Sequence, residues 1–194
     1  MKNLLIVLLV SVFAGCVSAV KVESGDRTIG DRLMVTLDGA WNQINAPGLG
    51  PAQTWTMEGL PVDQLLIYSG LKDGQAIHAE RTSASSNPQK SFNFRSTMQP
   101  DEIVSLFEGM LTRDGSRFKL VKLEPAAFGG NKGFHFEYSL TRKLDSVQLS
   151  GLGYGTVSKG ELFAIVYQAP RLTFFPRHQG RVEQIARSAR LKTM

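Results

Sequence analysis

The strongest pattern of apolar and polar positions lies in the second half of the chain and predicts a run of strands. Residues 133–140 alternate aromatic or aliphatic side chains with polar ones, as in a strand with one buried face. Residues 162–167 are apolar at every position, so we expect a strand that is covered on both faces. With similar stretches at 118–123 and 146–157, these segments predict four consecutive strands of an antiparallel sheet.

Glycine recurs at alternate positions in the third of these strands, at Gly151, Gly153 and Gly155. Because successive side chains of a strand point to opposite faces, the glycines leave one face bare. We expect something large, either a helix or an aromatic side chain from a neighbouring strand, to lie close over that face. The spacing does not match a dinucleotide-binding motif, whose third glycine would fall at Thr156.

Two helices are predicted, one before this run of strands and one after it. The first covers residues 100–111, where Pro100 suits the first helical position and Asp101 and Glu102 favourably occupy the first turn. Its apolar stripe, which we expect to pack on the sheet, consists of Ile103, Leu106, Phe107 and Met110. The second helix runs from about 178 to 190 and carries a narrower apolar stripe.

The first half of the chain predicts weaker elements. Residues 31–45 predict a first strand or a hairpin, because Leu33, Val35 and Leu37 alternate with less apolar residues and Asp38-Gly39 is a hairpin turn signal. The other expected elements are short strands at 54–57 and 62–68, an exposed polar loop at 72–88 and, at 91–95, either a strand or the end of that loop. Together the elements predict an α+β fold, an antiparallel sheet flanked by helices.

The amino terminus has the features of an export signal. Lys2 precedes an apolar run over residues 4–12, which is broken only by Ser11. A membrane-spanning helix needs ~20 apolar residues, so this run is too short to span and fits the apolar core of a secretory signal. The segment that follows, residues 12–16 (VFAGC), resembles the lipobox of bacterial lipoproteins.

That resemblance implies that a lipid is attached to the Cys16 thiol and that the chain is cleaved before this residue. Cys16 is the only cysteine, so it has no disulfide partner in the chain, and lipidation would account for a lone thiol in an exported protein. The alternative is ordinary signal cleavage after Ala19. Val17 after the cysteine resembles the sorting signal of Gram-negative outer-membrane lipoproteins, and two or more acyl chains give stable anchoring.

These observations predict a lipoprotein signal peptide at 1–15, a lipidated cysteine and tether at 16–30, and a single domain at 31–194. The expected location is the bacterial cell envelope, at the periplasmic face of the outer membrane, with the membrane as a partner through the lipid on Cys16. The composition, 42% hydrophobic and 20% charged, is typical of one globular domain. A chain of this size needs neither disulfides nor a metal to form a core.

The net charge is +5, and basic side chains gather near the carboxyl terminus. Arg181, Arg187 and Arg190 lie on or beside the outer face of the second predicted helix, and Glu183 is placed for a weak ion pair with Arg187. The simplest interpretation is a solvated helix face. The sharper hypothesis is contact with an anionic surface, either phospholipid headgroups or an acidic partner. Nucleic acid is not expected as the partner of an exported protein.

Residue patterns with catalytic or metal-binding chemistry are sparse. His135 and Glu137 share one side of a predicted strand, but a zinc site needs three or four ligands, so a polar strand face is the favoured interpretation. The chain has no Gly-x-Ser-x-Gly nucleophile elbow. We therefore expect no metal and no cofactor, and no residue is assigned a catalytic role.

The order of the elements resembles that of the PsbP-like proteins, whose fold is an α/β/α sandwich. The resemblance rests on residues 133–138 (GFHFEY), 164–170 (AIVYQAP) and 182–188 (VEQIARS), and it covers roughly 31–191. It implies a binding or assembly protein, and it carries no site residues because no diagnostic motif is shared. Fold alone does not fix function.

The leading hypothesis is therefore a lipid-anchored envelope protein that acts as a non-enzymatic binding or assembly module, with an envelope protein as its partner. The alternatives are a hydrolase or transferase of envelope substrates, or a carrier of a small apolar ligand. An enzyme should show a pocket with convergent polar groups and perturbed pKa values. A binding module should instead show a flat or apolar exposed patch.

Overall fold

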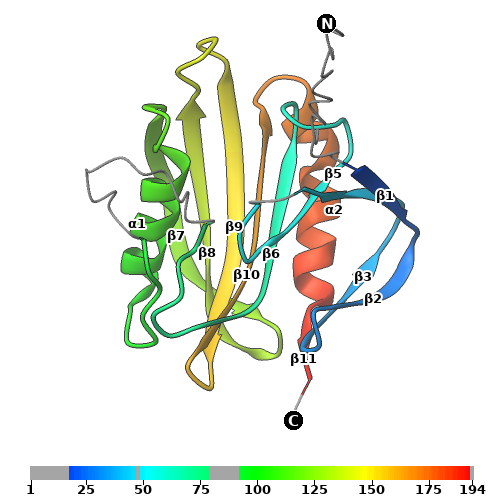
Figure 1. Cartoon of the computed structure of the whole chain (residues 1–194), viewed down its shortest axis with the longest axis vertical. Helices are drawn as coiled ribbons and strands as arrows, with labels where there is room; N and C mark the ends of the chain where they lie inside the picture. Colours follow the sequence, from blue (N-terminus) through cyan, green and yellow to red (C-terminus); the bar gives the residue numbers. More distant parts are fainter. Residues whose placement is uncertain (1–17, 47–48, 79–91, 193–194) are drawn as a thin grey trace, which may run out of the picture.

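The computed structural model describes residues 18–46, 49–78 and 92–192 and has one large antiparallel sheet, two helices and a small second sheet (Figure 1). The large sheet contains, in spatial order, β1 (Ser18–Val22), β4 (Trp41–Asn45), β5 (Gln53–Thr56), β6 (Gln64–Lys72), β10 (Glu161–Pro170), β9 (Gln148–Ser158), β8 (Asn131–Thr141) and β7 (Arg117–Phe128). The small sheet contains β11 (Arg190–Leu191), β3 (Leu33–Leu37) and β2 (Gly25–Ile29). The helices are α1 (Pro100–Leu111) and α2 (Phe174–Ser188).

The two helices cover opposite faces of the large sheet, which confirms the predicted α+β fold and α/β/α layering. Alternate side chains of β10 belong to two separate cores. Phe163, Ile165 and Tyr167 join the core beneath α2 and β3, whereas Ala164 and Val166 join the core beneath α1. The prediction that this strand is covered on both faces is therefore confirmed.

The bare face of β9 is filled by aromatic side chains from its neighbour β8, one of the two arrangements expected. Each glycine is paired across the ladder with the residue whose ring lies over it: Gly151 with Tyr138, Gly153 with Phe136 and Gly155 with Phe134. α1 then packs on this ridge of rings, with Phe107 stacked on Phe136 at a centroid distance of 5.6 Å. Phe107 is fully buried, as the helical stripe predicts.

The segment predicted as a tether, 16–30, is structured from Ser18 onward, and that part of the prediction is wrong. β1 pairs along its length with β4, and β2 pairs with β3. Four of the five side chains of β1 are exposed, and the only apolar alternation in its sequence is the short one of Val20 and Val22 around Lys21. Backbone hydrogen bonds to a neighbour distant in the sequence define this strand.

Of the two alternatives predicted for 31–45, the first strand is confirmed as β3 and the hairpin is wrong, because β3 and β4 belong to different sheets. β3 lies in the small sheet beside α2, whereas β4 crosses to the large sheet. Trp41, the first residue of β4, is fully buried in the core beneath α2. The Asp38-Gly39 signal marked a real change of chain direction but did not determine which strands would pair.

α1 has the predicted bounds, whereas α2 is shifted towards the amino terminus. α2 begins at Phe174 instead of near 178 and ends at Ser188, so Arg190 lies in β11 instead of on the helix. The earlier start is explained by packing, since the Phe175 ring stacks on Tyr167 at 6.1 Å between centroids and both lie against the core.

The remaining strands differ mainly at their ends. β7, β8 and β10 extend beyond the predicted 118–123, 133–140 and 162–167, and β6 begins and ends later than 62–68. The strand expected at 91–95 is reduced to one bridge, Asn93 with Ala76, and residue 91 lies outside the described residues. Residues 72–75, at the start of the loop predicted at 72–88, are exposed as expected, whereas Ile77 is fully buried, and the part from 79 onward is not described.

Candidate functional site

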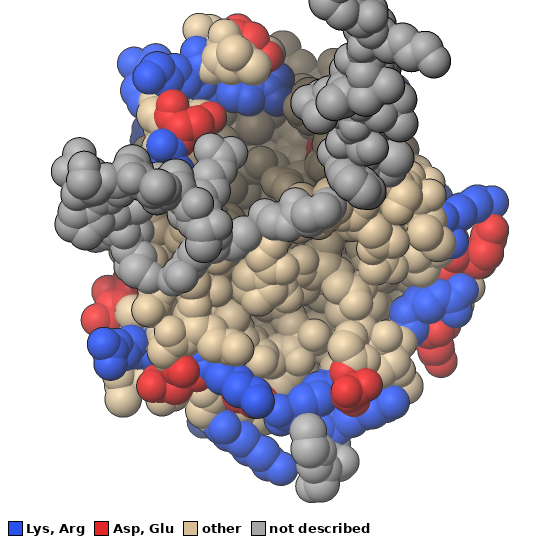
Figure 2. Space-filling model, viewed as in Figure 1, with Lys and Arg blue, Asp and Glu red and all other residues tan. Residues whose placement is uncertain are grey.

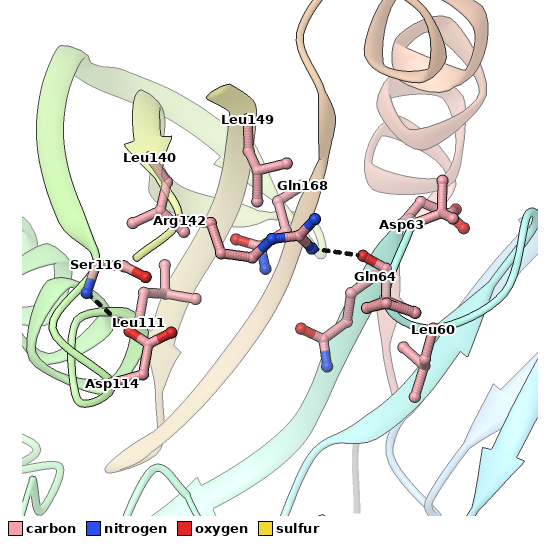
Figure 3. Close-up of a pocket in the computed structure, with 12 residues that line it drawn as sticks. Leu60, Asp63, Gln64, Leu111, Asp114, Ser116, Leu140, Arg142, Leu149 and Gln168 are labelled. Carbon is pink, nitrogen blue, oxygen red and sulfur yellow. Dashed lines mark hydrogen bonds between the residues drawn. The ribbon is translucent and has the colours of Figure 1, made fainter. Parts of the chain in front are cut away.

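A cavity of about 250 Å³ lies at one end of the large sheet (Figure 3). Its walls come from the loop before β6, the end of α1, the turn after β8 and the ends of β8, β9 and β10. The lining residues are Leu60, Pro61, Val62, Asp63, Gln64, Leu111, Asp114, Ser116, Leu140, Arg142, Leu149 and Gln168. Segments far apart in the sequence therefore form a single polar and apolar site.

Two glutamines at this end of the sheet are direct neighbours across a ladder. Gln64 of β6 is paired with Gln168 of β10, and Gln168 is paired in turn with Gly151 of β9. Directly opposite residues of an antiparallel pair have Cβ atoms about 5 Å apart and point to the same face. The two side chains consequently leave the same face of the sheet from neighbouring positions, and both line the cavity.

Tyr138 fixes the orientation of one of these carboxamides. Its ring lies over Gly151, and its hydroxyl donates a hydrogen bond of 3.2 Å to Oε1 of Gln168. Burial raises the pKa of Tyr138, so its hydroxyl keeps the proton that it donates. Since Oε1 of Gln168 accepts this bond, the amide nitrogen is the group left to face a ligand.

The amide nitrogen of Gln168 and the whole carboxamide of Gln64 make no hydrogen bond to the described part of the chain. Apolar walls surround them, because Leu140 and Leu149 are buried at the ends of their strands and Leu111 closes the side at α1. Leu60 is 39% exposed and lies at the rim. The cavity thus offers hydrogen-bonding groups within a mainly aliphatic wall.

The charged groups of the lining are already bonded to other parts of the protein. The carboxylate of Asp63 accepts hydrogen bonds from the Thr56 hydroxyl and from the backbone N–H groups of Met57 and Glu58, at 3.0 Å and 2.8 Å for the latter two. The carboxylate of Asp63 therefore holds the two ends of the loop before β6 together. It is 2% exposed, and the Tyr167 hydroxyl lies 3.5 Å from it on the other side of the sheet.

Arg142 joins the turn after β8 to the same loop. Its Nε and Nη2 donate to the two carboxylate oxygens of Asp145 at 2.9 Å and 2.6 Å, and its Nη1 donates to the Pro61 carbonyl at 2.9 Å. The hydrogen bonds from Arg142 lower the pKa of Asp145. The guanidinium therefore braces the cavity wall, and its charge is already compensated.

Asp114 is bonded in a similar way. Burial raises the pKa of its carboxyl, but hydrogen bonds from Ser116 outweigh that effect and hold the pKa below its usual value. The backbone N–H of Ser116 donates to Oδ1 of Asp114 at 2.8 Å. The ionisable groups of the lining thus hold the walls together, and the neutral carboxamides are the groups left for a ligand.

A second hollow of about 460 Å³ lies over β4 and β5 and is wide open to solvent. None of its lining residues is charged, and it includes Gln43, Asn45 and Gln53. Figure 2 shows uncharged surface on a larger scale: charged side chains gather at the rim of this view of the molecule, and the centre is uncharged. The hollow is shallow, and its polar groups do not converge as those of the cavity do.

The basic residues singled out from the sequence lie along α2 and β11 and do not meet at the cavity. Nε of Arg181 is 3.5 Å from Asp38, and Nη2 of Arg187 is 2.9 Å from Glu183, the ion pair that the helical spacing predicts. Arg190 is exposed on β11 and donates to the backbone carbonyls of Arg187 and Ala189. β11 lies at the opposite end of the molecule from the turn between β8 and β9 (Figure 1).

His135 lies on the predicted polar strand face. Its Nδ1 is 3.1 Å from Glu124 of β7, its Nε2 is 3.9 Å from Glu137, and its ring stacks on Tyr154 at 4.4 Å. Across residues 18–46, 49–78 and 92–192, no group of three or more His, Cys, Asp or Glu side chains is placed to hold a metal ion. Cys16 lies outside the described residues.

The expected flat apolar patch is not seen in the described residues. The most exposed large hydrophobic side chains are Leu144 at 88%, in the loop between β8 and β9, and Leu172 at 83%, in the loop between β10 and α2. The sequence analysis missed Gln64, Gln168 and Arg142, which define the cavity. The one available signal was the single polar residue, Gln168, between the apolar run and Ala169-Pro170.

Comparison with known proteins supports the fold and goes no further. No family model matches the chain, and no curated protein matches it. The solution structure of cyanobacterial PsbP (CyanoP) from Synechocystis sp. PCC 6803 is similar, with a TM-score of 0.57 and 12% sequence identity over 93% of this chain and 96% of that chain. The fold is therefore PsbP-like. Within the described ranges, no helix is long and apolar enough to cross a membrane.

Proposed function

We propose that this protein is a lipid-anchored component of the bacterial envelope that acts as a non-enzymatic binding or assembly module through the cavity at the end of the large sheet. The proposal rests on a difference in hydrogen bonding between the ionisable and the neutral residues of the lining. Asp63, Asp114 and Arg142 are bonded within the protein, whereas Gln64 and the amide nitrogen of Gln168 form no hydrogen bond with the described residues. Carboxamides donate and accept hydrogen bonds, but they do not serve as general acids, general bases or nucleophiles at neutral pH.

A pocket with polar groups was the feature expected of an enzyme, but the chemistry of these groups favours binding over the hydrolase or transferase alternative. Catalysis by proton transfer needs an ionisable group that can reach the substrate and change its charge there. A carrier of a small apolar ligand is less well supported, because an apolar ligand would cover the Gln64 carboxamide and the amide nitrogen of Gln168 without bonding to them, at a cost of ~1–3 kcal/mol each. A ligand that itself forms hydrogen bonds matches the lining better.

The proposed location depends on Cys16. After cleavage before this residue, only Val17 would separate the lipid from β1, and two residues span at most ~7 Å. The edge of the large sheet would then lie close to the membrane surface. The test is Cys16→Ser, which should abolish incorporation of labelled palmitate and release the protein from the membrane fraction. Ser18→Ala, which keeps the thiol, should change neither, and membrane retention by Cys16→Ser would rule out the anchor.

Binding at the cavity is tested by photo-cross-linking in intact cells of the organism that produces the protein. A photoreactive residue replaces Leu60 at the cavity rim in one variant and the exposed Leu172, which is not among the lining residues, in the control. We expect a discrete adduct from position 60 that is absent from position 172 and reduced when Gln168→Leu is added. Identical labelling from both positions, or none from position 60, would contradict a binding role for the cavity.

A further inference from the structure

We propose that the ligand of the cavity is an uncharged peptide group together with one leucine-sized apolar side chain, presented by a segment of a partner protein. This inference rests on the proposed binding function and specifies its chemistry. Three features of the cavity carry it: the pair of carboxamides, the charge balance of the lining and the volume.

The carboxamide pair has the hydrogen-bonding capacity that one peptide group requires. A peptide group has one N–H donor and one carbonyl acceptor, and both need partners when they are buried. Gln168 can supply the donor, because Tyr138 already occupies its oxygen. Gln64, paired directly opposite Gln168, can supply the acceptor through its side-chain oxygen. A ligand amide between them would give a partner to the amide nitrogen of Gln168 and to the side-chain oxygen of Gln64.

The charge balance favours a neutral ligand. Arg142 is neutralised by two hydrogen bonds to Asp145, and Asp63 and Asp114 add two carboxylates to the lining. An anionic ligand would therefore lose its hydration without gaining an unpaired cation. A cationic ligand would meet carboxylates whose oxygens already accept hydrogen bonds from Thr56 and Ser116.

The volume limits the ligand to a small unit. Sites for drug-sized molecules and cofactors occupy ~300–1,000 Å³, and this cavity of about 250 Å³ lies below that range. Leu111, Leu140 and Leu149 give it an aliphatic wall suited to one branched side chain. The opening at Leu60, which is 39% exposed, lets the rest of a partner segment continue into solvent.

The test uses the detergent-solubilised full-length protein, with the side-chain amide signals of its glutamines followed by NMR. The probe is N-acetyl-leucinamide, which contains the proposed side chain between two uncharged amides. We expect saturable shifts of the Gln64 and Gln168 signals, with a dissociation constant on the order of 1 mM for so small a ligand. Gln168→Leu should weaken binding by about tenfold, as expected for one net hydrogen bond.

The controls separate the features of the ligand. N-acetylglycinamide lacks the side chain and N-acetyl-leucine carries a carboxylate, so each should bind about tenfold more weakly or worse. Gln184→Leu makes the same substitution on the exposed face of α2 and should bind like the wild type. Matching backbone spectra of Gln168→Leu and the wild type exclude misfolding as the cause of any loss.

Two results would overturn this assignment: equal binding of all three amino-acid probes, or binding of methyl glucoside in place of N-acetyl-leucinamide, which would indicate a hydroxylated ligand. If N-acetyl-leucinamide does not bind but the cavity still forms its cross-link in cells, the peptide assignment fails and the binding function stands. Loss of both would contradict both proposals.

Discussion

Nη1 of Arg142 donates a hydrogen bond of 2.9 Å to the carbonyl oxygen of Pro61, although the two residues lie 81 positions apart in the sequence. The bond joins the turn after β8 to the loop before β6, and these segments form facing parts of the cavity wall (Figure 3). The side chain of Arg142 is 21% exposed, and its bond to Pro61 lies at an exposed position. Two distant parts of the chain are thus joined at the wall of the cavity.

Removal of this bridge should destabilise the protein. Arg142→Ala deletes the bond to Pro61 and both bonds to Asp145. Bonds to charged groups contribute ~1.5–3 kcal/mol, and partial exposure reduces this, so we expect a loss of ~1–2 kcal/mol in the free energy of unfolding, measured with urea. Arg117→Ala, an exposed position on β7, should change it by less than ~0.5 kcal/mol. Equal losses would mean that the bridge contributes nothing specific.

Substitution of glycine by alanine should have opposite effects on stability at Gly153 in β9 and at Gly180 in α2. A Cβ at Gly153 would clash with the Phe136 ring, so Gly153→Ala should cost ~1–3 kcal/mol through overpacking. A Cβ at Gly180 in α2 would meet no atom within 4 Å, so Gly180→Ala should stabilise the helix by ~0.5–1 kcal/mol. Thermal unfolding of both variants tests this, and a neutral Gly153→Ala would show that the rings can move aside.

The pKa of Glu58 predicts a pH-dependent contribution to stability. The hydrogen bond from His178, with Nε2 at 2.8 Å, and a further contact with Arg177 hold the pKa of Glu58 below its ordinary value of 4.5 despite the opposing effect of burial. Because this pKa is lower in the folded state than in the unfolded one, the carboxylate stabilises the fold above pH 4.5, and this contribution is lost as the pH falls through the folded-state pKa.

Wild type should therefore be more stable than Glu58→Gln at neutral pH, and the difference should shrink below about pH 4.5. The measurement is the urea midpoint of both proteins from pH 7 to pH 3. Glu108→Gln on α1 removes a carboxylate that makes no side-chain hydrogen bond within the described residues, and it serves as the control. A difference for Glu58→Gln that is constant over this range would contradict the assigned contacts.

The basic side chains of α2 and β11 remain a proposed contact for anionic lipid. The ion pairs of Arg181 and Arg187 are solvent-exposed and weak, so both can exchange partners, and each basic group near an anionic bilayer is worth ~1 kcal/mol. Full-length protein with Cys16→Ser should bind anionic liposomes at low salt and release them at high salt. Changing Arg181, Arg187 and Arg190 to glutamine should weaken binding.

The matched control removes the same charge elsewhere, by changing Arg95, Arg113 and Arg117 to glutamine. It should bind almost as well as the parent protein. Equal binding by the two triple variants would assign the attraction to net charge alone, and no binding at any salt concentration would leave α2 and β11 with a structural role.

The sequence by itself determined the elements whose signal is local. α1 has its predicted bounds because its proline, its acidic first turn and its apolar stripe lie within one segment. β8, β9 and β10 were found because alternation or continuous apolarity reports burial, and the glycines of β9 correctly indicated a large group above them. The PsbP-like α+β fold follows from these elements and their order.

Only the tertiary structure decided which segments meet. The sequence of β1 carries only the short alternation of Val20 and Val22, and the place of this strand in the sheet depends on backbone bonds to β4. The cavity was missed for the same reason: Gln64, Arg142 and Gln168 come together through strand register and a long-range hydrogen bond. A single polar residue such as Gln168 belongs to no periodic pattern. Its role depends on neighbours that are distant along the chain, so the sequence pattern alone could not reveal it.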